Sequence, residues 1–177
     1  MEKITDRTGF DTVMGIDASL AVARNYEERE KFNEAYLKWW EISLHWQKGP
    51  VGRDSLHGMA RCKLAVYDRH PEHKRPLYDA SCLSIAKSSY QKFGMLYPDD
   101  AAEIGAYRKV REIDEQLADK QLTIGRYYQK VGNIQAANLY FDMVVRDWAD
   151  SKAAETAREM LAENQDLATE SEAASEK

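Results

Sequence analysis

The sequence predicts an all-α protein: a right-handed solenoid of about three helix hairpins followed by a C-terminal capping helix. Two observations lead to this prediction, a composition that favours helix and an internal repeat. The 177 residues include 22 Ala and 13 Leu but only 8 Val, 8 Ile, 9 Gly and 4 Pro. Because β-branched residues lose rotamer freedom in helices and are the minority here, an extended sheet protein is disfavoured.

Start and stop signals divide the chain into elements. Capping residues such as Asp17 and Ser151 begin helices, whereas Gly-Pro, His-Pro and Tyr-Pro pairs end them. We expect hairpins at 17–47, 54–97 and 100–148 and a capping helix at 151–164. The helix that begins at Asp100 is expected to be the longest and to end at Gly132. Residues 1–16 are a lead-in that can be flexible, and 165–177 form an acidic disordered tail.

An internal repeat with a period of 51 residues supports these hairpins. Ala35, Ala86 and Ala137 are each 51 residues apart, and an aromatic and an apolar residue follow four and seven positions after each. The followers are Trp39 and Ile42, Tyr90 and Phe93, and Phe141 and Val144. Such a stripe lies on one helix face, where the small residue lets a neighbouring helix approach.

An upstream helix precedes each stripe. In the first and third units, a small residue stands twelve positions before the alanine, and an aromatic residue follows it three positions later. These pairs are Ala23 with Tyr26 and Gly125 with Tyr128. The middle unit has Ala60 lying 26 residues before Ala86, which leaves about 14 extra residues centred on a loop at 69–76. The pattern resembles the tetratricopeptide helix hairpin, and the resemblance covers about residues 17–148.

The chain from Leu77 onward carries narrower motifs. They are Leu77-Tyr78-Asp79-Ala80, Tyr90-Gln91-Lys92-Phe93, Leu96-Tyr97-Pro98, Ile113-Asp114-Glu115-Gln116-Leu117-Ala118, Ile124-Gly125-Arg126-Tyr127-Tyr128, Gly132-Asn133, Ala136-Ala137 and Tyr140-Phe141. They resemble the later repeats of the outer-membrane assembly lipoprotein family called BamD, YfiO or ComL. The match spans about Pro76 to Leu161.

This resemblance implies a non-catalytic scaffold at the periplasmic face of the outer membrane. Its partners would be subunits of the β-barrel assembly machinery or outer-membrane protein precursors, and its later repeats would dock the machinery. The chain shows no signal core, no lipid-acceptor Cys near its start and no apolar run of about 18 residues, so membrane attachment would need a lipid anchor that this chain does not carry. A generic peptide-binding adaptor, cytosolic or periplasmic, is the alternative.

The charge and motifs disfavour other classes. The net charge is −5, of which residues 163–177 carry −4, so the body is nearly neutral and unlike a nucleic-acid binder. There is no phosphate loop, Gly-x-Ser-x-Gly or His-Glu-x-x-His motif, and we expect neither catalysis nor a cofactor. His70 and His73 have ligand-like spacing, but Pro71 breaks the helix that would aim them at one metal. Cys62 and Cys82 are interpreted as small buried residues, and their pairing stays open.

Two basic features are candidates for partner binding. Arg24, Arg61 and Arg126 each follow the small residue of a first helix, and a 100° step would turn them to the concave side. There they would suit a carboxylate or acidic peptide, with Leu20 and Leu122 as apolar neighbours. The plainer interpretation is that these are ordinary surface arginines.

The inserted loop is the second candidate, because insertions on a repeat scaffold gather on one face and often make contacts. Its basic residues are Arg69, His70, His73, Lys74 and Arg75. A merely longer connection is the alternative. Tyr36, Trp40 and Leu44 form a second stripe on their helix, which we expect to pack against the next repeat, although Trp40 could instead be an exposed anchor.

Overall fold

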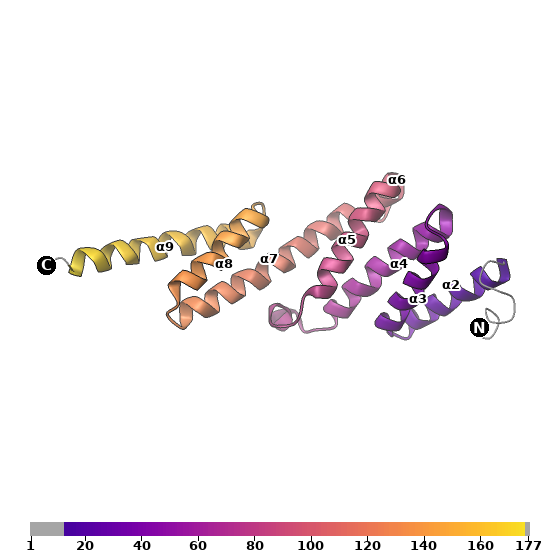
Figure 1. Cartoon of the computed structure of the whole chain (residues 1–177), viewed down its shortest axis with the longest axis horizontal. Coiled ribbons are helices and arrows are strands. Elements are labelled where there is room, and N and C mark those ends of the chain that lie inside the picture. Colours follow the sequence, from indigo (N-terminus) through magenta and orange to yellow (C-terminus); the bar gives the residue numbers. More distant parts are fainter. Residues whose placement is uncertain (1–12, 176–177) are drawn as a thin grey trace. The chain divides into compact units, whose positions relative to one another are not determined.

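The computed structural model describes residues 13–175, and every regular element within them is helical (Figure 1). The elements are α2 (Val13–Glu28), α3 (Phe32–His45), α4 (Gly49–Asp68), the 3-10 helix η1 (Glu72–Leu77), α5 (Ser81–Leu96), α6 (Pro98–Glu103), α7 (Ala106–Lys130), α8 (Ile134–Asp147) and α9 (Lys152–Ser175). These helix hairpins confirm the all-α, tetratricopeptide-like fold class. Residues 1–12 of the expected lead-in over 1–16 lie outside the described residues, whereas 13–16 belong to α2 and are not a lead-in.

The chain divides into two compact units. The first contains the described residues up to Glu72 together with Asp79–Val110, and the second contains His73–Tyr78 and the chain from Arg111 onward. Each unit has a buried core of its own.

The first unit is built from helices that pack in chain order, α2 on α3, α3 on α4 and α4 on α5. Small residues at these contacts are fully buried, with Ala23, Ala35, Ala60 and Ala86 all 0% exposed. Gly58 permits the closest approach, since a Cβ at this position would lie 2.5 Å from the Trp39 ring. The indole of Trp39 therefore packs directly against the α4 backbone at Gly58.

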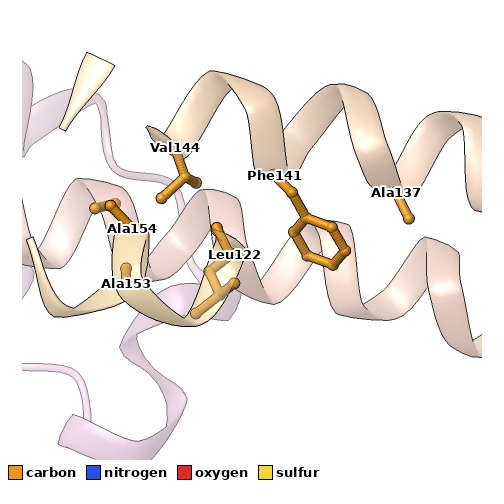
Figure 2. Close-up of a cluster of buried hydrophobic side chains, with 8 residues drawn as sticks. Leu122, Ala137, Phe141, Val144, Ala153 and Ala154 are labelled. Atoms are coloured by element: carbon orange, nitrogen blue, oxygen red, sulfur yellow. The ribbon is translucent and has the colours of Figure 1, made fainter. Parts of the chain in front are cut away.

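The second unit has the same construction. Figure 2 shows Ala137, Phe141 and Val144 on the side of α8 that faces Leu122 of α7 and Ala154 of α9. A Cβ at Gly125 would lie 2.5 Å from the Phe141 ring. Glycine is therefore required for α7 and α8 to pack this closely.

Three predicted helix boundaries within the first 132 residues differ from the structure. Asp17, expected to cap the first helix, lies inside α2, which begins at Val13. The Gly-Pro pair at 49–50, expected to end a helix, instead begins α4, because proline is well tolerated in the first turn. The helix expected to run from Asp100 to Gly132 is interrupted, since α6 ends at Glu103 and α7 begins at Ala106. Gly105, with φ +67, makes the break because glycine adopts this conformation without a steric penalty.

The C-terminal helix is longer than predicted. α9 continues to Ser175, whereas the sequence predicted a helix end near Asn164 and a disordered tail from 165. The side chain of Asn164 is buried and hydrogen-bonds Gln129 at 2.9 Å and Asn138 at 2.6 Å. These bonds tie α9 to α7 and α8 at the point where the prediction ended it. The last two residues lie outside the described part of the chain.

Candidate partner-binding surface

The two predicted arginines of the first unit lie at the boundary between α2 and α4. Arg24 on α2 forms an ion pair with Asp54 on α4, with Nη2 3.7 Å from Oδ2. In the opposite direction, Arg61 on α4 donates to Glu27 on α2, from Nε to Oε2 at 2.8 Å and from Nη2 to Oε1 at 2.9 Å. Two ion pairs therefore link α2 and α4, each with its arginine on a different helix. Arg24 and Arg61 lie along the edge where these two helices meet.

Glu27 joins three helices through one carboxylate. Its side chain is only 16% exposed, and besides Arg61 it accepts a hydrogen bond from the indole Nε1 of Trp39 on α3. Burial, followed by the charge of Glu27, raises the pKa of the Cys62 thiol to about 12. Because the thiolate is the reactive form of cysteine, Cys62 is an inert core residue. Cys62 and Cys82 are both buried free thiols.

The row of charges continues along α4 to α6. Arg53 donates from Nη1 to Asp100 at 3.0 Å and contacts Asp54 at 3.3 Å. The carboxylate of Asp100 is the main cause that raises the pKa of Arg53. Positive and negative groups therefore alternate from Arg24 to Asp100. An acidic partner that binds this face has to compete with carboxylates of the chain itself.

His57 lies on the same face of α4, between positions 54 and 61 at helical spacing. Its ring packs against Tyr90 and Phe93 of α5, with centroids 6.3 Å and 5.6 Å apart. Burial, with a smaller contribution from Arg61, lowers the pKa of His57. His57 is therefore a neutral, half-buried group at pH 7 and adds no cation to the face.

Neither predicted leucine offers an exposed apolar surface here. Leu20 is partly buried against the core of the first unit, and Leu122 is 3% exposed in the core of the second. Both leucines stand three residues before the small interface residues Ala23 and Gly125. Residues three apart share a helix face, so they point into the hairpin rather than toward a partner. For Leu122 the prediction of a partner contact is wrong.

Arg126 lies on α7 and is exposed in the second unit, whereas Arg24 and Arg61 belong to the first. Within the first unit, the structure brings Arg24 and Arg61 together. Sequence reasoning did not find their partners Glu27 and Asp54, because only helix packing places residues so far apart in the chain within bonding distance.

The basic loop is partly used in internal contacts. In the first unit, Arg69 pairs with Glu30 at 3.4 Å and lies over the ring of Phe32, while His70 packs edge-on against Tyr67. In the second unit, His73 and Lys74 are exposed and Arg75 is half-buried. The ammonium of Lys120 donates to the carbonyl oxygens of Pro76, at 3.1 Å, and Tyr78. Arg69, His73 and Lys74 are therefore the exposed basic residues of the loop, and Arg69 is already paired with Glu30.

Other kinds of site find little support in the residues that the structure describes. Among them, no group of three His, Cys, Asp or Glu side chains is arranged to hold a metal ion. No described helix is both long and apolar enough to cross a membrane.

Helix hairpins that pack on one another through small residues define a helical-repeat protein. In the first unit, charged side chains line the edge where α2 and α4 meet. A sequence model of the YfiO family, described as outer membrane lipoprotein, matches residues 56–177, which is more than half of the chain. The chain therefore belongs to this outer membrane lipoprotein family. A search of curated proteins finds no match to the chain.

Proposed function

We propose that this chain is a non-catalytic scaffold that docks protein partners during the assembly of outer-membrane proteins. The observation that carries this proposal is the family match over residues 56–177, which includes every helix from α5 onward and most of α4. Repeat proteins of stacked hairpins bind partners through extended surfaces rather than deep clefts, and the chain offers such surfaces on both units. The partners would be subunits of the β-barrel assembly machinery or precursors of outer-membrane proteins.

The charged edge of α2 and α4 is the proposed docking face of the first unit, and its arginines have different roles. Arg24 is 58% exposed and holds Asp54 through a single contact at 3.7 Å, so it can exchange that carboxylate for a partner's. Arg61 makes two short bonds to a mostly buried carboxylate, which suits a structural pair. Arg24 and, on the second unit, Arg126 are therefore the proposed partner-binding arginines, with His73 and Lys74 as further contacts.

The proposed place of action is the periplasmic face of the outer membrane, with attachment through lipid. This follows the family to which the chain belongs, whose description is that of an outer membrane lipoprotein.

Binding to purified subunits of the assembly machinery tests the proposal. The chain and its Arg24→Gln, Arg126→Gln and double variants are compared. Arg146→Gln on α8 is the matched control, because Arg146 is also exposed and pairs with its neighbour in the chain, Asp147. We expect the wild type and the control to bind alike and the double variant to bind at least tenfold more weakly, since a charged hydrogen bond contributes about 1.5–3 kcal/mol. If no subunit binds but acidic peptides do, the chain is a generic adaptor instead.

A further inference from the structure

An apolar groove on the first unit is separate from the charged edge. Two adjoining pockets of about 270 and 350 Å³ share Leu56, Met59 and Lys92 in their linings. α4 provides the floor of this groove, α3 contributes a wall with Trp40 and Leu44, and α5 contributes residues from Ser84 to Leu96. The groove is thus lined by three helices of a single compact unit.

Large apolar side chains of the groove are exposed to solvent. Trp40 is 46% exposed, Leu44 53% and Leu96 48%, although all three lie on well-packed helices. Leaving such side chains in water forfeits the free energy that their burial would give, roughly 25 cal/mol for each Å². A rimmed apolar patch of this kind is typical of a surface that another element covers.

The dimensions and polar groups of the groove favour a helix as its occupant. From Ser84 to Leu96 the wall spans thirteen residues, or about 18 Å of helix, which is a little over three turns. Strand addition, in which an extended peptide pairs with a sheet edge, is not available here, because the described residues contain no strand. The hydroxyls of Ser43 and Ser89 are already bonded to the carbonyl oxygens of Trp40 and Ile85. A helix satisfies its own backbone, so it loses no hydrogen bonds on entering.

The charge of the groove indicates the chemistry of that helix. Among the described residues that line the two pockets, Lys92 carries the only charge, and it stands where the pockets meet. We propose that this groove binds an amphipathic helix of a partner protein, with aliphatic anchors at i, i+4 and i+7 and a carboxylate that pairs with Lys92. The groove lies apart from Arg24 and Arg61, so its binding can be measured independently of the docking face.

A pair of designed peptides tests this assignment. The probe is a fluorescein-labelled alanine-based helix with leucines at i, i+4 and i+7 and one flanking glutamate, and its twin has lysine in place of that glutamate. Anisotropy titrations are done with the whole chain, with Lys92→Glu and with Leu44→Lys. Leu139→Lys is the matched control, because Leu139 is an exposed leucine of α8, outside the groove.

We expect the wild type to bind the glutamate peptide about tenfold more tightly than the lysine peptide. Lys92→Glu should reverse this preference by about the same factor, which corresponds to 1.4 kcal/mol in binding free energy. Leu44→Lys should weaken both peptides, and Leu139→Lys should bind as the wild type does. Lys92 is exposed, so its variant tests the charge even if Leu44→Lys fails to fold. A wild type that binds neither peptide, an unchanged preference in Lys92→Glu, or an equal loss in Leu139→Lys would each overturn the proposal.

Discussion

Arg61 of α4 holds the carboxylate of Glu27 of α2 in a two-bond pair, with Nε 2.8 Å from Oε2 and Nη2 2.9 Å from Oε1. The same carboxylate accepts the indole N–H of Trp39 from the helix between them in the chain. One acidic side chain therefore fastens α2, α3 and α4 at their charged edge. This arrangement makes Arg61 part of the scaffold, while Arg24 keeps its exposure.

Replacing Arg61 by alanine should destabilise the first unit. Removing the guanidinium leaves a mostly buried carboxylate without its cation, which costs about 1–3 kcal/mol in the free energy of unfolding. Arg24→Ala, which breaks one long exposed pair, should cost less than about 1 kcal/mol. Urea unfolding followed by circular dichroism measures both. Equal effects of the two variants would contradict the structural role of Arg61.

Stability should fall below pH 6.5 because of His57. Its pKa is lowered in the folded protein, so the unfolded chain binds the proton more tightly. Neutral His57 makes its full contribution to the free energy of unfolding above the unfolded pKa of about 6.5. This contribution is lost as the pH falls toward the lowered pKa of the folded state. The urea midpoint should therefore drop less between pH 7.5 and 5.5 in His57→Gln than in the wild type. The exposed His73→Gln serves as control, and a wild-type drop in His57→Gln would refute the assignment.

Adding a methyl group at Gly125 should disrupt the second unit. The new Cβ would lie 2.5 Å from the ring of Phe141, so the two helices must separate, at a cost of about 1–3 kcal/mol or more. Phe141→Leu in the same chain removes the clashing ring atoms and should recover part of that loss relative to the sum of the single variants. Thermal unfolding of the wild type, the two single variants and the double variant gives the coupling free energy between the two positions. Strict additivity would show that Gly125 and Phe141 do not pack as described.

The buried side chain of Asn164 should hold α9 in place. Asn164→Ala leaves the amide of Gln129 and the oxygen of Asn138 without this partner, which should cost about 1–3 kcal/mol. Gln165→Ala, one residue further on an exposed position, should be neutral. Hydrogen exchange of the α9 amides resolves the effect locally. If both variants leave α9 equally protected, the asparagine is not an anchor.

The hairpin packing was predictable because it depends on local periodicity. Ala35, Ala86 and Ala137, which a simple 51-residue spacing identifies, are all 0% exposed. The break at Gly105 was not predictable, because a glycine in an otherwise periodic segment is equally compatible with a continuous helix. The position of Leu122 was misread for a related reason: it lies one turn from both Arg126 and Gly125, and only the packing shows which face it shares.

The candidate surface was only partly accessible to sequence reasoning. The arginines stand out by their spacing, but Glu27, Asp54 and Asp100 become their partners through contacts between separate helices. For the apolar groove, the sequence offered only the alternative that Trp40 is an exposed anchor. Its walls come from helices far apart in the chain, so no local pattern defines it.

Site-specific photo-crosslinking in the native envelope tests the docking role most directly. A photoreactive amino acid replaces Arg24 or Arg126 in the full chain, and Arg146 on α8 as the control position, and the products are identified by mass spectrometry. The proposed scaffold predicts crosslinks to a subunit of the outer-membrane assembly machinery or to an outer-membrane protein precursor at positions 24 and 126, well above those at 146. Crosslinks at positions 24 and 126 no stronger than at 146, or only to proteins outside the envelope, would contradict it.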